Sequence, residues 1–272
     1  MRITDFNSEP IAVLPFLNAG RRPGEFYKDS LPVYHGCVEQ LPDGVDAILA
    51  TADLQGRQML SRNPRSPAKL VGEVLPRLLE ESLLDLGIDS PKRVLTLLGG
   101  DFYTYPDLRG RGGTGDVTPV WEAMSDNYGW VVGVTGNHDM FGEQKSYIPD
   151  FAPPTHVLDA ERIEIEGISI AGISGVIGNP AKNFRRDLPN HLDVLELILM
   201  DETDILVMHD GPDAPNVPRC RGDSDVRAVI ERCKPSLVVR GHSHWSQPLV
   251  ELTDDVQVLN VDATVAILTR PG

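Results

Sequence analysis

The chain has 272 residues, of which 41% are hydrophobic, so it can bury a substantial core in one large α/β domain. Its formal net charge at pH 7 is -15, and a strongly acidic surface repels the phosphates of long nucleic acids and of anionic membranes. The charge therefore argues against a dedicated DNA-binding module, although a bound cation can reverse the field at one site.

The cysteines and the start of the chain indicate the compartment. Cys37, Cys220 and Cys233 are odd in number and lack the spacing of metal ligands, which favours reduced thiols in a cytosolic protein. The first residues lack the apolar stretch of a signal peptide, and no apolar run approaches the roughly 18 residues that a membrane helix needs. We therefore expect a cytoplasmic protein that does not bind membranes.

The first half of the chain predicts an irregular extension followed by alternating strands and helices. Residues 1–44 mix short apolar runs with proline, glycine and arginine, which predicts an edge strand and a long loop. Further along, apolar runs predict buried strands, and apolar positions at helical spacing predict helices. The strands are expected at 45–52, 94–98 and 130–134, and the helices at 68–87, with a kink or break at Pro76, and at 118–127.

The second half predicts the same alternation and then a β-rich end. Residues 157–174 alternate in polarity and predict a hairpin that turns at Glu166-Gly167. Helices near 190–200 and 223–233 each precede a short apolar strand, and residues 247–269 predict two or three closing strands. Alternating helices and strands indicate a layered α/β protein. No repeat or linker is evident, so we expect a single domain that spans residues 1–272.

Five of the predicted strands end in a side chain that can bind a metal ion. Ligands of open α/β sheets gather at the carboxyl ends of strands, so these side chains are expected to share one site. The five residues are Asp53, Asp101, Asn137, His209 and His242.

This mixture of side chains suits the hydrolysis of a phosphate ester. Such a reaction needs charge neutralised on the phosphoryl oxygens and a hydroxide at neutral pH, which two cations about 3.5–4 Å apart supply. A carboxylate can bridge two ions, whereas a neutral imidazole cannot. Imidazole favours transition metals, so the set predicts manganese, iron, zinc or nickel rather than calcium.

The order of the motifs resembles the calcineurin-like metallophosphoesterase family. The resemblance spans residues 53–244, and it implies a four-layer α/β/β/α sandwich of two mixed β-sheets flanked by helices. It also implies hydrolysis of phosphate mono- or diesters by a metal-bound hydroxide. The motifs, in chain order, are Asp53-Leu54-Gln55-Gly56, Gly100-Asp101, Gly136-Asn137-His138-Asp139, His209-Asp210-Gly211-Pro212 and Gly241-His242-Ser243-His244.

The resemblance also implies a role for each matching residue. Asp53 and His244 look like ligands of a first metal, and Asp101 looks like the carboxylate that bridges the two ions. The ligands of the second metal would be Asn137, His209 and His242.

Two further residues of the motifs would carry the chemistry of the leaving group. His138 resembles the family's catalytic histidine, which protonates the leaving oxygen or steadies the phosphate. Asp139 looks like the partner that orients it.

The chain departs from the family at Gln55, where a histidine is usual two residues after the first aspartate. A glutamine offers a neutral amide oxygen, which is a harder and weaker ligand than imidazole. Either Gln55 binds the first metal weakly or a water replaces it. We therefore expect lower affinity at that position and a shift toward manganese.

Three arginines near the motifs are weaker candidates for phosphate contacts. Arg57 follows Asp53 closely, and Arg109 and Arg111 lie in the glycine-rich loop after Asp101. A guanidinium matches phosphate well, so Arg57 and Arg109 are predicted to bind substrate. The competing interpretation is a solvated loop whose charge serves solubility.

The substrate class and the alternatives follow from the same residues. The acidic charge favours a small phosphoester, such as a monoester, a cyclic nucleotide or another diester, over a long nucleic acid. The alternative is a metal-bound scaffold or interaction protein of the same fold with little activity, which Gln55 favours and the intact His138 and Asp139 oppose. A serine hydrolase is not supported, since Ser174 lacks the second glycine of a nucleophile elbow.

Overall fold

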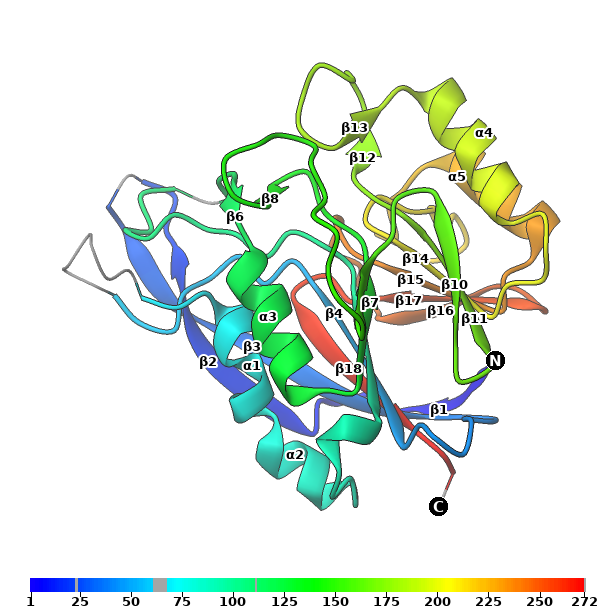
Figure 1. The fold of residues 1–272 in the computed structure, drawn as a ribbon, viewed down its shortest axis with the longest axis horizontal. Helices are drawn as coiled ribbons and strands as arrows, with labels where there is room; N and C mark the ends of the chain where they lie inside the picture. The colour runs from blue at the N-terminus through cyan, green and yellow to red at the C-terminus, as the bar shows by residue number, and fades with distance from the viewer. Residues whose placement is uncertain (23, 61–67, 111, 272) are drawn as a thin grey trace.

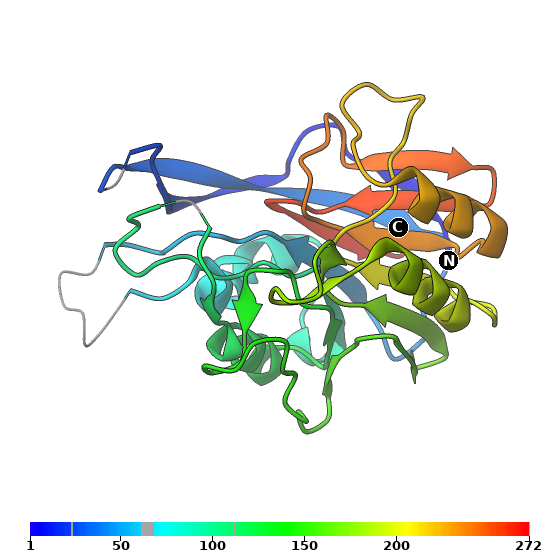
Figure 2. The ribbon, with the colours of Figure 1, turned by 90° about the horizontal axis from the view of Figure 1, so that it is seen from above.

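The structure is a computed structural model that describes residues 1–22, 24–60, 68–110 and 112–271. Two β-sheets pack face to face, and helices cover the outer face of each sheet (Figures 1 and 2). This arrangement confirms the four-layer sandwich that the motifs imply.

The first sheet is built around three parallel strands that are apolar along nearly their whole length. Its order is β1-β3-β18-β4-β5-β7-β9, with β2 beside β3, and β18 runs antiparallel to β4. Parallel strands covered on both faces read as continuous apolar runs, which is why the sequence predicted them well. The strands from the middle to the far edge are β4 (Ala47–Ala52), β5 (Val94–Leu98), β7 (Trp130–Gly133) and β9 (Thr155–Val157), with β18 at Thr264–Thr269.

The N-terminal segment corrects the prediction of an edge strand and a long loop over residues 1–44. It forms three strands: β1 (Ile3–Phe6), β2 (Ala12–Ala19) and β3 (Phe26–Val38). Prolines in the two long strands disguised the pattern, because proline usually ends a strand. Pro15 is tolerated because β2 lies at the edge beside β3, and an edge strand does not need every N–H.

The second sheet has the order β10-β11-β14-β15-β17-β16. The predicted hairpin is confirmed as β10 (Glu161–Ile165) and β11 (Ile168–Ile173), and the chain does end in three strands. Of these three, β16 and β17 belong to the second sheet while β18 returns to the first, so the C-terminus joins the two sheets. The remaining strands are β14 (Ile205–Met208), β15 (Leu237–Arg240), β16 (Leu249–Thr253) and β17 (Val256–Asn260).

In the described part of the chain, five α-helices cover the sheets. The helix predicted over 68–87 is broken in two at Leu79, close to Pro76, as the proline suggested. The helices are α1 (Val71–Leu78), α2 (Glu80–Asp85) and α3 (Thr118–Asn127) over the first sheet, and α4 (Leu188–Ile198) and α5 (Ser224–Cys233) over the second. The short elements are η1 (Pro91–Arg93), β6 (Gly115–Asp116), β8 (Asp139–Met140), β12 (Val176–Ile177) and β13 (Arg185–Arg186).

Hydrophobic clusters fill the spaces between the layers. One joins α1, α2 and α3 to the first sheet around Trp121, and another joins α4 and α5 to the second sheet. The cluster between these two contains side chains of both sheets, such as Leu97 and Val239. The two sheets therefore share one core, and their strand ends are held in a fixed relation. That the whole chain forms one domain stays a prediction.

Candidate metal centre

The predicted ligands follow strands of both sheets. Asp53 comes directly after β4, and Asp101 comes shortly after β5, which is the parallel neighbour of β4. His209 and His242 follow β14 and β15, which are parallel neighbours in the second sheet. His209 lies against Asp101 across the two sheets. The carboxyl ends of the parallel strands therefore meet at one edge of the sandwich.

Three of these residues have a left-handed backbone conformation. The φ angles are +57° at Asp53, +59° at Asp101 and +67° at His242. Side-chain-bearing residues seldom adopt such angles, and each costs of the order of 1 kcal/mol. Position 136 must also be a glycine, because a Cβ there would overlap Oδ1 of Asp101. The turns after these strands are shaped to present donor atoms.

Asp101, His209 and His242 form a compact group of metal donors. Their donor atoms all lie within 4.8 Å of one another. His209 is fully buried, and its Nδ1 donates to the carbonyl of Gly99 at 2.7 Å, which leaves Nε2 to face Asp101 Oδ2 at 3.2 Å. A histidine whose second nitrogen is bound to a carbonyl in this way is held as a metal ligand.

Two buried atoms beside this group lack a hydrogen-bond partner among the described residues. They are Nε2 of His209, which contacts Asp101 without hydrogen-bond geometry, and Oδ1 of Asn137. Asn137 is only 8% exposed, and its backbone carbonyl accepts from Nδ2 of Asn183 at 3.1 Å. Buried polar atoms without partners are costly unless something else satisfies them. An imidazole nitrogen and an amide oxygen next to a carboxylate fit a divalent transition-metal ion.

The groups around Asp101 shift one another's pKa values through their charges. Burial would raise the pKa of Asp101, but the neighbouring His209 and His138 hold it below its usual value. Burial acts to lower the pKa of His209, yet the charges of Asp101 and Asp53 raise it to about 10. His242 has a lowered pKa because of burial and the charge of His209. The carboxylates thus create a negative potential that attracts cations.

The predicted ligands of the first metal are less tightly gathered. Oδ2 of Asp53 accepts the backbone N–H of His242 at 2.8 Å, and the amide nitrogen of Gln55 donates to Oδ2 of Asp101 at 3.3 Å. The His244 side chain is 79% exposed, and the compact donor group includes neither Asp53 nor His244. Asp53, Gln55 and His244 therefore lie next to the site, but their donor atoms do not converge as those of the compact group do.

Asp262 is a member of the site that the sequence analysis missed. Its Oδ2 lies 3.2 Å from Nδ1 of His244, and its side chain is only 14% exposed. Its backbone bridges to Ala52, which precedes Asp53. The signal was present, because Asp262 follows the buried strand β17 just as the five predicted residues follow theirs. Asp262 fixes an imidazole that would otherwise turn freely in solvent.

His138 and Asp139 have different surroundings. Nε2 of His138 lies 4.0 Å from Oδ2 of Asp101, and its Nδ1 lies 3.1 Å from the carbonyl oxygen of Gly113. The expectation that Asp139 orients this ring is wrong, because the buried Asp139 carboxylate accepts the backbone N–H groups of residues 101, 102 and 136. Burial raises the pKa of Asp139 to about 6. Asp139 holds the turn that carries Asp101.

The predicted substrate arginines do not behave alike. Arg57 is only 4% exposed, and its guanidinium donates to the carbonyls of Ala68 and Thr104, so its prediction as a phosphate ligand is wrong. The cause is that these two carbonyls already use the donors of the guanidinium. Arg109 is exposed and stacks on Tyr105 at 4.2 Å, and its role stays a prediction. Arg111 lies outside the described residues.

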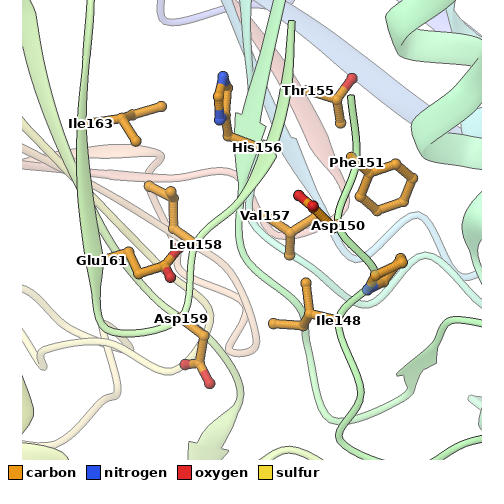
Figure 3. A pocket seen from close by; sticks show the side chains of 11 residues that line it. Ile148, Asp150, Phe151, Thr155, His156, Val157, Leu158, Asp159, Glu161 and Ile163 are labelled. Carbon is orange, nitrogen blue, oxygen red and sulfur yellow. The ribbon is translucent and has the colours of Figure 1, made fainter. Parts of the chain in front are cut away.

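Two cavities differ in their relation to the site. One of about 370 Å³ is lined by Asp53, His244 and Asp262 and so opens beside the metal donors. Another of about 310 Å³ lies between β9 and β10, under the loop that carries Phe151 (Figure 3). None of the predicted site residues lines this second cavity, so it is separate from the metal centre.

Comparison with known proteins agrees with this geometry. The family model described as calcineurin-like phosphoesterase matches residues 42–246, which is most of the chain. The protein therefore belongs to the calcineurin-like phosphoesterase family, whose chemistry is metal-dependent hydrolysis of phosphate esters. The family implies divalent metal ions, and the donor group around Asp101 provides a place for them.

A solved structure shares the fold at low identity. The protein TT1561 of Thermus thermophilus is 16% identical, with a TM-score of 0.51 over 80% of this chain and 90% of that one. The calcineurin-like phosphoesterase YfkN from Bacillus subtilis is 12% identical, with a TM-score of 0.43 over 79% of this chain and 80% of that one. No curated protein matches the chain. Among the described residues, none of the helices is long and apolar enough to cross a membrane.

Proposed function

We propose that the protein hydrolyses small phosphate mono- or diesters with a pair of divalent metal ions. The observation that carries the proposal is the group of Asp101, His209 and His242, whose donor atoms lie within 4.8 Å beside the unpartnered Oδ1 of Asn137. Such a set of one carboxylate, two imidazoles and an amide oxygen suits a divalent transition-metal ion, and ions of this kind assist the hydrolysis of phosphate esters.

The chain's residues divide into two groups of ligands around Asp101. Asn137, His209 and His242 would hold one ion, and Asp53, His244 and the weaker ligand Gln55 would hold the other, with Asp101 between them. When bound, such ions neutralise the phosphoryl oxygens and lower the pKa of water. Gln55 contributes an oxygen rather than an imidazole, which favours manganese among the candidate metals, with iron, zinc or nickel as alternatives.

His138 is suited to protonate the leaving oxygen. The Gly113 carbonyl can only accept, so Nδ1 of His138 must carry a hydrogen in the contact at 3.1 Å. The proton that can be transferred is then the one on Nε2, which lies 4.0 Å from Oδ2 of Asp101 and on the side of the metal donors. A half-exposed ring can both receive a proton from solvent and deliver it to a bound ester.

The substrate is proposed to be a small molecule. The net charge of -15 disfavours the approach of a long polyanion, whereas one phosphate can be neutralised by the bound ions. A cytoplasmic location is consistent with the three free cysteines but stays a prediction.

The test is turnover of a chromogenic phosphate monoester and diester with manganese, with and without a chelator. We expect turnover that the chelator abolishes and that His138→Ala lowers by about 100-fold or more. The matched control is His156→Ala, a histidine of the cavity in Figure 3, which should stay near wild type. A lack of turnover with manganese, iron, zinc and nickel would contradict the proposal and support the scaffold.

A further inference from the structure

The cavity of about 370 Å³ beside Asp53 and His244 has a wall that this chain builds from outside the family's segment. The β2–β3 hairpin supplies Phe16, Asn18, Asp29 and Tyr34, and the C-terminal strands close the other side. The hairpin lies entirely before residue 42, where the family match begins. A substrate whose phosphate sits at the metal centre would therefore extend its organic part against a wall that lies outside the segment matched by the family model.

The charges in the cavity exclude a second anionic group. Three carboxylates line it, those of Asp29, Asp53 and Asp262, and the described lining residues include no lysine or arginine. Asp53 is a proposed metal ligand, and Oδ2 of Asp262 lies 3.2 Å from Nδ1 of His244. Asp29 is the carboxylate that remains for a substrate. A phosphate or carboxylate in this place would meet repulsion, whereas an ammonium group would meet attraction.

Asp29 is held in a defined position. The side-chain nitrogen of Asn18 and the hydroxyl of Tyr27 each lie 3.0 Å from its Oδ2, and the N–H of Ser30 donates to its Oδ1 at 3.0 Å. Side-chain entropy that is already lost in the free protein is not lost again on binding. A fixed carboxylate in a cavity is a better partner for an amine than a mobile one on the surface.

Three aromatic side chains form part of the rest of the wall. Phe16 is 8% exposed, and the ring of Tyr34 stacks on Phe6 with 5.8 Å between centroids. Trp245 is 4% exposed, with Arg240 stacked on its ring at 5.1 Å and its Nε1 donating to the carbonyl of Arg221. These surfaces suit a short hydrocarbon chain between the phosphate and the amine.

We propose that this cavity receives the organic part of a phosphate ester of an amino alcohol, with the ammonium group at Asp29. The inference rests on the proposed function, because the metal centre places the phosphate. The inference goes beyond that function because it assigns to the cavity a preference for esters of a cationic alcohol over esters of a neutral or anionic one.

The test compares three ligands of similar size: 2-aminoethyl phosphate, propyl phosphate and 2-carboxyethyl phosphate. Their dissociation constants are measured by calorimetry on the manganese-loaded protein carrying His138→Ala, so that the result does not depend on turnover. We expect the amine to bind about fivefold more tightly than the propyl ester, the size of an exposed ion pair, and the carboxylate to bind most weakly. Equal affinities, or a preference for the carboxylate, would overturn the inference.

Variants of Asp29 assign the preference to one residue. Asp29→Asn should bring the affinity ratio of the amine and propyl esters close to one, and Asp29→Lys should reverse the order of the amine and carboxylate esters. The control is Asp193→Asn, which makes the same change of charge on an exposed residue of α4, away from the cavity. It should leave the ratio unchanged, and a ratio that Asp29→Asn leaves unchanged would refute the role of Asp29.

Failure of the two proposals can be told apart. If the three ligands bind in the expected order but no ester is hydrolysed by the wild-type protein, the binding site stands and the hydrolytic function falls. If all the esters are hydrolysed and bound equally well, the hydrolytic function stands and the assignment of the cavity falls.

Discussion

The two halves of the metal centre differ in how firmly the fold holds their ligands. Around Asp101, the Asp101, Asn137 and His209 side chains are buried, His209 is fixed through Gly99, and the donors of three residues lie within 4.8 Å. Around Asp53, the amide of Gln55 replaces an imidazole, and the His244 side chain is 79% exposed. The contrast teaches that one ion site is formed by the fold itself, whereas the other depends on side chains that must be held. We therefore expect one tight and one weak ion.

Asp101→Asn should have the largest effect, because this carboxylate is the one group that both halves share. We expect activity to fall by about 1000-fold, which corresponds to about 4 kcal/mol of transition-state stabilisation, and both ions to bind more weakly. Metal content and turnover of the purified variant provide the measurement. Retention of two ions at wild-type affinity would break the comparison, since Asp101 would then not bridge.

Gln55→His should make the two halves more alike. An imidazole is a stronger ligand for transition metals than an amide oxygen, so the weak ion should bind about tenfold more tightly and zinc should gain on manganese. Calorimetric titration with each metal measures both effects. The tight ion is the internal reference, and a change in its affinity alone would show that Gln55 belongs to the other half.

Asp262→Asn should weaken the same ion from the opposite side. Loss of a carboxylate that orients a ligating histidine usually lowers metal affinity by about 10- to 100-fold. We expect the lower end of that range, because His244 is exposed and can find other orientations. Asp193→Asn again provides the control for charge. The idea fails if the affinity of the weak ion is unaltered while that of the tight ion drops.

His191→Leu should have the smallest effect, and it concerns the support of the second sheet rather than the ligands. His191 on α4 is 1% exposed, neither ring nitrogen has a partner among the described residues, and burial lowers its pKa. The unfolded chain then binds more protons, so this residue costs stability as pH falls below about 6.5. The variant should lose less melting temperature than wild type between pH 7 and pH 5. An equal loss would show that His191 does not contribute.

The sequence predicted the structure best where burial alone determined the type of residue. Buried parallel strands are apolar throughout, so their ends and the ligands that follow them could be located from the sequence. Asp139 was assigned to the wrong neighbour, because nothing in the motif shows that its carboxylate faces backbone N–H groups. Arg57 was misjudged for the same reason, since burial of a guanidinium depends on how a loop folds. The β2–β3 hairpin was hidden because its prolines lie in strands near the edge of a sheet.

The left-handed backbone at Asp53, Asp101 and His242 lowers the stability of the fold. Glycine would relieve the conformational cost at each of them and would also remove a ligand. A search for thermostable variants that ignores activity should therefore select glycine at these three positions, and the variants it returns should be inactive. Selection for melting temperature alone would in this way point to the functional residues by eliminating them.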